Sequence, residues 1–303
     1  MMKIGILGLG GVGGFVGSPL ASLHIEDLQV VFICRGESRK AILENGLTLT
    51  SQGQNITARP DIVSDNPEEI GLLDYLIIAT KSYSLLSVIK EYSSCLNQDS
   101  VVITLQNMVN AKEMITEEFS NQFRILEGCI YVAANIESPG IIRHIGGPGK
   151  IIVGGEYRPP DEKFINICQK SGLDISFEEN IKPVLWSKYL FVAPIAAITT
   201  AYDITFGQLR ENEELMSLAR SLMMEIYLLA DAKGIKLPDT IIDASLSLLS
   251  KFSYDSKSSL QVDFELGKKQ TEKEFFIDYI ISESKKNGLP NFNRINKEIV
   301  SRN

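Results

Sequence analysis

The feature that most constrains the fold of this chain is a cluster of glycines at its amino terminus. Seven of the 23 glycines fall within the first 17 residues. The cluster contains the segment Gly8, Leu9, Gly10, Gly11, Val12 and Gly13. Residues 3–7 before it form a short apolar run typical of a buried strand, and the residues after it are helix-forming to about Leu23. A glycine turn between a strand and a helix predicts the first unit of a parallel α/β sheet.

Each glycine of this GxGxxG pattern has its own geometric role. Gly8 permits a tight turn off the strand, Gly10 lets the backbone approach a pyrophosphate, and Gly13 lets the helix pack closely on the strand. The pyrophosphate then lies on the free N–H groups at the amino terminus of the helix. A purely structural glycine turn is the alternative, but the position between a strand and a helix favours a dinucleotide site.

Short apolar runs alternate with polar, helix-forming stretches through the rest of the first half. The expected strands are residues 28–34, 73–79, 100–105 and 123–126, and the expected helices include 84–96 and 111–119. This alternation predicts a parallel sheet with helices on both faces. Glycines and two prolines among β-type residues over 131–155 predict antiparallel strands that close the domain.

The pattern changes after about residue 178. Helical periodicity dominates from there, with expected helices at 181–200, 213–232 and 271–286. The last two end at a glycine followed by a proline, a common helix stop. We therefore predict an α/β protein with a Rossmann-type parallel-sheet domain at residues 1–178 and an all-helical domain at residues 179–303.

Charge and composition exclude several classes of function. With 30 basic and 38 acidic residues the net charge is −8, which argues against binding to nucleic acid or anionic lipid. Two histidines and four cysteines without a CxxC pair indicate neither a metal site nor a redox pair. The longest apolar run, 189–201, is too short for a membrane span. We expect a cytoplasmic protein without a metal, nucleic-acid or membrane partner.

The end of the second expected strand bears on cofactor choice. An acidic residue there would accept hydrogen bonds from the ribose 2′-hydroxyl of NAD. The sequence instead has Arg35 directly after Cys34, and a guanidinium can form a forked contact with a 2′-phosphate. We predict NADP(H) with Arg35 as its main contact. For Arg39 and Lys40, a solvated basic turn is an equally good interpretation.

Two further polar residues follow expected strands at the edge where doubly wound sheets bind ligands. Lys81 follows the strand at 73–79, and Asn107 follows the strand at 100–105. An amide at position 107 would be able to contact a ribose or a substrate carbonyl. Taken alone, each is more often an ordinary surface residue.

Lys188 lies in an otherwise apolar helix, where a lysine is costly to bury unless it is paired or lies on a cleft. It shares one helix face with Val192, Ala196 and Thr199. If that face lines a cleft, Lys188 is a candidate acid. The alternative is a lysine whose ammonium only reaches water.

These features in this order resemble the ketopantoate reductase (2-dehydropantoate 2-reductase) family over nearly the whole chain. The matching segments are residues 3–14, Arg35-Gly36, Thr80-Lys81, 105–107, 138–147, 186–188, Ser258-Ser259, Asp263, Thr271-Glu272 and 288–290. Separately these segments are weak signals, and their order makes them specific.

The resemblance implies a Rossmann domain, a helical domain and an active site between them that reduces a 2-keto acid with NADPH on the pathway to pantothenate. It implies that Lys188 is the general acid and that Glu272 helps to hold the substrate and the lysine. It also implies that Asn107 orients the substrate and that Ser259 contacts the substrate carboxylate. We further expect a small anionic keto acid as the ligand, and a homodimer.

Three departures from the family pattern concern the substrate. Val192 and Ala196 stand where the family has asparagines, Met108 follows LQN in place of glycine, and one extra residue lies between Gly267 and Thr271. The pocket side formed by Val192 and Ala196 is therefore more apolar, and apolar groups cannot replace hydrogen bonds to a hydroxylated substrate. Three interpretations stay open: a ketopantoate reductase, a reductase of a less polar 2-keto acid, and a catalytically idle NADP(H)-binding sensor.

Overall fold

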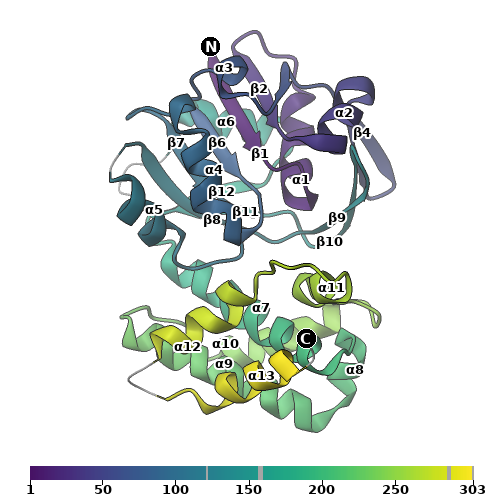
Figure 1. Cartoon of the computed structure of the whole chain (residues 1–303), viewed down its shortest axis with the longest axis vertical. Coiled ribbons are helices and arrows are strands. Elements are labelled where there is room, and N and C mark those ends of the chain that lie inside the picture. The colour runs from purple at the N-terminus through teal and green to yellow at the C-terminus, as the bar shows by residue number, and fades with distance from the viewer. Residues whose placement is uncertain (121, 156–159, 285–287, 302–303) are drawn as a thin grey trace. The chain divides into compact units, whose positions relative to one another are not determined.

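The chain divides into two compact units in the computed structural model, which describes residues 1–120, 122–155, 160–284 and 288–301. The first unit comprises Met1–Gln106 and Asn110–Ile181, and the second comprises Asn107–Val109 and Lys182–Asn303. Strands with helices build the first unit, and helices build the second (Figure 1). The predicted fold class is confirmed. The sequence did not indicate that Asn107–Val109 pack with the helical unit.

An eight-stranded sheet forms the framework of the first unit, in the order β12-β11-β8-β7-β6-β1-β2-β5. Its strands are β1 (Met2–Leu7), β2 (Leu28–Ile33), β5 (Ile62–Ser64), β6 (Tyr75–Ile78), β7 (Val101–Thr104), β8 (Arg124–Ile130), β11 (Ile151–Gly154) and β12 (Ile175–Glu178). All neighbours from β8 to β5 are parallel, whereas β11 runs antiparallel to β8. The strands are almost continuously apolar because both faces of a parallel sheet are covered.

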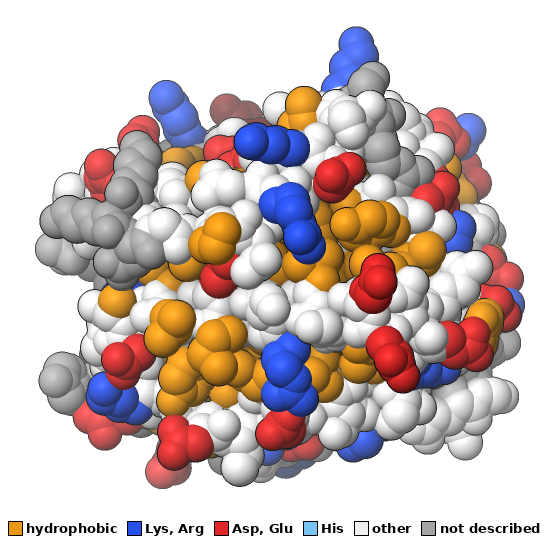
Figure 2. Space-filling view, turned by 90° about the horizontal axis from the view of Figure 1, so that it is seen from below, with side chains coloured by type: hydrophobic (Ala, Val, Ile, Leu, Met, Phe, Trp, Pro, Cys, Tyr) orange, Lys and Arg blue, Asp and Glu red, His pale blue; other side chains and the backbone are white. Residues whose placement is uncertain are grey.

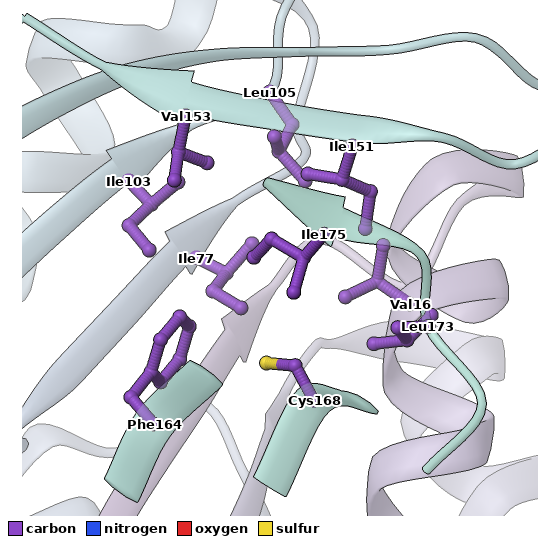
Figure 3. Close-up of a pocket in the computed structure, with 10 residues that line it drawn as sticks. All are labelled: Val16, Ile77, Ile103, Leu105, Ile151, Val153, Phe164, Cys168, Leu173 and Ile175. Atoms are coloured by element: carbon purple, nitrogen blue, oxygen red, sulfur yellow. The ribbon is translucent and has the colours of Figure 1, made fainter. Parts of the chain in front are cut away.

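Helices connect and cover these strands. They are α1 (Gly11–Ala21), α2 (Gly36–Asn45), α3 (Pro67–Ile70), α4 (Leu85–Glu91), α5 (Ala111–Phe119) and α6 (Glu162–Lys170). Val16 of α1 and Phe164 of α6 face Ile77 and Ile103 of the sheet around a cavity of about 10 Å³ (Figure 3). A space of that size with apolar walls holds no ligand. The centre of this layer is therefore packed core.

A second, four-stranded sheet lies against α1. Its order is β4-β3-β10-β9, from β3 (Leu47–Ser51), β4 (Gln54–Ala58), β9 (Ala133–Ser138) and β10 (Ile141–Gly146). The antiparallel pairing of β9 with β10 confirms the expectation for residues 131–155. A Cβ on Gly11 would lie 1.9 Å from the carbonyl oxygen of Ala134, and one on Gly14 would lie 2.3 Å from Ile142 Cγ1. Glycines of α1 therefore permit the contact with this sheet.

The second unit consists of helices around α7. The helices are α7 (Lys182–Tyr202), α8 (Phe206–Glu211), α9 (Glu213–Ala232), α10 (Ile241–Leu248), α11 (Ser259–Glu265), α12 (Tyr279–Glu283) and α13 (Pro290–Ser301). A π-helix, Glu274–Asp278, precedes α12, where the sequence predicted one continuous helix over 271–286. The end of that predicted helix, Lys286, lies outside the described residues.

Helix α7 is long and apolar enough to match a membrane span by length and composition, although its longest uninterrupted apolar run is short. Its most apolar window has a mean hydropathy of 1.4, but 72% of that window is buried within the structure. Trp186, Leu190 and Ile195 are among its buried residues. The apolar character of α7 is therefore explained by its place in the core of the helical unit.

Apolar and charged side chains are interspersed on the face shown in Figure 2. Exposed large apolar residues of the helical unit include Met224 and Leu228 of α9 and Val300 of α13. Figure 2 shows the apolar side chains of this face gathered in small groups between charged ones. The expected homodimer stays a prediction.

A buried carboxylate of α9 fixes the start of α13. Glu225 is 6% exposed, and its Oε1 accepts hydrogen bonds of 2.8 Å from both the backbone N–H and the side-chain amide of Asn291. Its Oε2 accepts a bond of 3.0 Å from Phe292 N–H. The first N–H groups of a helix have no partner within the helix, and a negative charge there is favourable. Glu225 therefore caps α13 from a neighbouring helix.

Replacing Glu225 by alanine should lower the free energy of unfolding by about 2–4 kcal/mol, because it leaves buried donors without an acceptor. Urea unfolding followed by the fluorescence of Trp186, the single tryptophan of the chain, reports on the helical unit. Glu298→Ala is the control, since it removes an exposed carboxylate from α13 itself and should change stability by less than about 0.5 kcal/mol. Equal losses in the two variants would contradict the capping role.

Candidate functional site

Three loops meet at the carboxyl edge of the large sheet. Gly8 follows β1 with φ +91°, and a Cβ at this position would lie 2.7 Å from Thr80 Cγ2 in the loop after β6. Gln106, after β7, directs its Nε2 to Thr80 Oγ1 and to the Lys81 carbonyl oxygen, both at 3.4 Å. Two of the predicted cofactor residues, Gly8 and Lys81, thus lie in adjoining loops. Gln106 is an additional polar residue of this edge.

The glycine turn combines a closed side with an open side. A Cβ on Gly13 would lie 1.9 Å from the carbonyl oxygen of Gly8, so the first turn of α1 rests directly on the backbone leaving β1. A Cβ on Gly10 would meet nothing within 4 Å. Gly10 is also the N-cap of α1 and supplies no side chain to the free N–H groups. Open space in front of unpaired N–H groups is the geometry that binds a phosphate.

The flanking apolar residues of the turn support it from inside. Leu9 is 6% exposed and belongs to the core of the first unit, and Val12 is half-buried and packs against that core. Their side chains hold the loop on the sheet while the backbone at Gly10 stays partly exposed.

Arg35, the residue predicted to contact a 2′-phosphate, is the N-cap of α2 and has an ion-pair partner. Its Nη2 donates a hydrogen bond of 2.8 Å to Glu91 Oε2 at the end of α4. This carboxylate raises the pKa of the Arg35 guanidinium. Nearby, Arg39 Nε lies 3.4 Å from Asp65 Oδ1. Nothing in the sequence marked Glu91 or Asp65, because each pair joins segments distant along the chain.

In the helical unit, Lys188 and Asn107 are in direct contact. Lys188 Nζ donates a hydrogen bond of 2.6 Å to Asn107 Oδ1, although the two residues are 81 positions apart. Both side chains are half-buried. The short segment that carries Asn107 is held on α7 by a second bond, of 3.0 Å, from Lys182 Nζ to the carbonyl oxygen of Val109. The ammonium of Lys188 thus has an amide partner, unlike a lysine that only reaches water.

The same face of α7 continues through apolar residues to a buried hydroxyl pair. Val192 is half-buried and Ala196 is 1% exposed. One turn further, Thr199 Oγ1 lies 2.8 Å from Ser258 Oγ. Ser258 is the N-cap of α11 and its side chain accepts a bond from Gln261 N–H, whereas the predicted substrate residue Ser259 is exposed. The middle of this face therefore presents apolar surface and no side chain that can form a hydrogen bond.

Glu272, the second predicted catalytic residue, is 5% exposed and lies two residues before the π-helix. Its carbonyl oxygen accepts hydrogen bonds of 3.0 Å from Phe275 N–H and Phe276 N–H. The hydroxyl of Tyr189, next to Lys188 on α7, donates to the carbonyl oxygen of Phe275. Burial raises the pKa of Tyr189, so this hydroxyl stays protonated and can keep donating. The segment with Glu272 is thereby attached to α7.

The loop with the extra residue is also attached to a buried group. Lys268 Nζ donates a hydrogen bond of 2.6 Å to Asp263 Oδ1, and the Asp263 side chain is only 5% exposed. Lys268 itself is 45% exposed, so it lies at the surface while its ammonium pairs with a buried carboxylate. A turn of five residues brings the cation back to the carboxylate of α11, which the helical pattern alone could not show.

Each of the two units matches a domain of the same protein family. The profile of the family described as ketopantoate reductase PanE/ApbA matches residues 4–156, and the profile of its C-terminal domain matches residues 180–292. A 2-dehydropantoate 2-reductase of Pyrococcus abyssi (strain GE5 / Orsay) is 30% identical over 283 residues, which cover 92% of this chain and 88% of the relative.

Solved structures share the fold over almost the full length. A PanE/ApbA family ketopantoate reductase from Ralstonia eutropha JMP134 has a TM-score of 0.88 at 22% identity, covering 99% of this chain and 98% of its own. A D-mandelate dehydrogenase with NADH and anilino(oxo)acetate has a TM-score of 0.85 at 22% identity, with the same coverage. The two profile matches and the relative from Pyrococcus abyssi show that the chain belongs to the ketopantoate reductase family, a family of nicotinamide-dependent oxidoreductases.

Proposed function

We propose that this protein reduces a small 2-keto acid with NADPH, with 2-dehydropantoate, which gives pantoate, as the first candidate substrate. The observation that carries the proposal is the hydrogen bond of 2.6 Å from Lys188 Nζ to Asn107 Oδ1. The family resemblance assigns protonation of the substrate oxygen to Lys188 and orientation of the substrate to Asn107. The contact brings both side chains to one place, so that a single substrate could meet both of them.

The glycine turn fits the cofactor. A bound NADPH supplies the hydride. The open backbone at Gly10 and the free N–H groups of α1 would hold its pyrophosphate, and Arg35 would contact its 2′-phosphate. Lys81, in the loop beside Gly8, adds a positive charge near the same edge of the sheet.

Lys188 provides the proton that completes the reduction. When the keto carbon accepts a hydride, its oxygen gains a negative charge, which an ammonium stabilises and then neutralises by donating one proton. The product is the 2-hydroxy acid, and the amine of Lys188 is protonated again from water. Asn107 Oδ1 accepts one hydrogen of the ammonium and thereby directs the remaining hydrogens. Glu272 is proposed to hold the lysine and the substrate from its buried position.

A less polar keto acid is a second candidate substrate. Val192 and Ala196 present no hydrogen-bonding group on the face that continues from Lys188. Buried polar groups discriminate strongly for a substrate hydroxyl, whereas apolar groups cannot. The same fold serves a D-mandelate dehydrogenase seen with anilino(oxo)acetate, a ligand with an aromatic substituent. The third interpretation, an idle NADP(H)-binding sensor, predicts cofactor binding without turnover of any 2-keto acid.

Restoring a family asparagine tests the substrate assignment. Val192→Asn should raise kcat/KM for 2-dehydropantoate relative to phenylglyoxylate by about tenfold, because a new side-chain amide can pair with the substrate hydroxyl. The rates are measured by the loss of NADPH absorbance, and each variant serves as its own control because only the ratio is compared. An unchanged ratio would remove Val192 from the substrate pocket. No oxidation of NADPH with any 2-keto acid, despite NADPH binding, would leave the sensor interpretation.

Lys188→Ala tests the acid. The variant should lose about 10²–10⁴-fold in kcat, since a positioned acid acts mainly in the transition state. The dissociation constant of NADPH, measured by fluorescence titration, should stay nearly unchanged. Lys236→Ala is the control, because Lys236 is an exposed lysine of the same unit. A Lys188→Ala variant with the kcat of the control would exclude this residue from the mechanism.

Gly10→Ala tests the pyrophosphate site. An added Cβ at this position meets no protein atom within 4 Å, so the fold should be retained. The methyl group would occupy the space proposed for the pyrophosphate and should weaken NADPH by at least about tenfold. Gly146→Ala is a matched control, because a Cβ there also meets nothing within 4 Å. Equal NADPH affinity in both variants, with unchanged circular dichroism, would place the pyrophosphate elsewhere.

A further inference from the structure

The two arginines that follow β2 are each paired with an acid from another part of the first unit. Arg35 Nη2 lies 2.8 Å from Glu91 Oε2, and Arg39 Nε lies 3.4 Å from Asp65 Oδ1. Glu91 is the last residue of α4, and Asp65 follows β5. The guanidinium that is proposed to bind a 2′-phosphate therefore already has an anionic partner.

Both acids are held in place by the same buried residue. Tyr92, directly after Glu91, is 1% exposed, so its ring anchors the end of α4 in the core. The Tyr92 hydroxyl donates a hydrogen bond of 3.3 Å to the carbonyl oxygen of Asp65. The segments that carry the two carboxylates are thus joined. The backbone of Glu91 therefore stays near Arg35 when a ligand displaces the carboxylate.

The Arg35–Glu91 pair is weak enough to be displaced. The side chains are 60% and 40% exposed, and ion pairs with such exposure contribute little to stability. A phosphate is a stronger partner for a guanidinium, because it carries more charge and accepts two parallel hydrogen bonds. A 2′-phosphate at Arg35 would replace the carboxylate, which would then lie close to a second anion.

We propose that Glu91 is a cofactor-selectivity residue, which competes with the 2′-phosphate of NADPH for Arg35. This inference rests on the proposed function, because it requires a nicotinamide dinucleotide at this edge of the sheet. NADH has no 2′-phosphate and leaves the ion pair intact. A carboxylate near the ribose is also a suitable acceptor for the 2′-hydroxyl of NADH. Glu91 therefore narrows the preference for NADPH over NADH.

The test is the substitution Glu91→Gln, which keeps the shape of the side chain and removes its charge. The dissociation constant of NADPH should fall by about three- to tenfold, because the competing and repelling charge is lost. The dissociation constant of NADH should stay constant or rise. Glu118→Gln is the matched control, because it removes one exposed carboxylate of the same unit from α5. Both constants of this control should equal those of the unmodified protein.

A second variant, Arg35→Ala, tests whether Glu91 affects NADPH binding through Arg35. In the Arg35→Ala background, Glu91→Gln should improve NADPH binding by less than about twofold, because the two groups act on each other. Weaker NADPH binding by Glu91→Gln would overturn the inference and make Glu91 a residue that positions Arg35. An equal change for both cofactors, or no change, would overturn it too. If the unmodified protein binds neither cofactor, the proposed function itself fails. If it binds NADPH and only the Glu91→Gln result differs from expectation, the inference fails and the proposed function stands.

Discussion

Close approach of backbone to backbone around α1 is the constraint on which the first unit depends. Gly13 packs on the carbonyl oxygen of Gly8, and Gly11 packs on the carbonyl oxygen of Ala134. A Cβ added to either glycine would lie only 1.9 Å from that oxygen. Any side chain at these positions would separate α1 from β1 or from the second sheet. The glycine cluster therefore does more than form the turn between β1 and α1. It also lets the second sheet pack on the same helix, which explains why glycines extend past the GxGxxG pattern to Gly14.

A single buried helix has the corresponding role in the second unit. Helix α7 carries Lys188 in a half-buried position while its neighbours Trp186 and Tyr189 are buried in the core. Packing fixes the helix, and the hydrogen bonds of Lys188 and Lys182 fix the segment of Asn107 on it. The lysine ammonium is thereby held by a rigid element and by an amide partner. Such preorganisation is what a proton donor needs, because the donor must already point to the site where charge develops.

The cations discussed above each have a specific hydrogen-bonding or ion-pair partner. Lys188 meets an amide, Lys268 meets Asp263, and Arg35 meets Glu91. Only the last of these pairs joins two exposed side chains, so it is the one that an incoming anion can rearrange most easily. The net charge of −8 thus gives no measure of affinity for an anionic cofactor. That affinity depends on which carboxylate competes for each cation.

Local sequence signals were sufficient to predict the fold class, the family and most of the helices and strands. Glycine spacing, hydrophobic periodicity and helix stops are local signals, and α9 lies at Glu213–Ala232, where they predicted it. The π-helix before α12 left no such signal; within it, the carbonyl oxygen of Phe275 accepts a hydrogen bond from the hydroxyl of Tyr189 on α7.

The side-chain contacts of the candidate site became visible only in the three-dimensional packing of the chain. Lys188 was a candidate because of its apolar surroundings, but its contact with Asn107 joins residues 81 positions apart. The pairing of Arg35 with Glu91 joins two exposed residues that have ordinary neighbours in the sequence. Local patterns report the backbone path and the buried face of each element. Contacts between distant segments depend on how those elements pack against one another. No local sequence pattern shows which distant residues will come together.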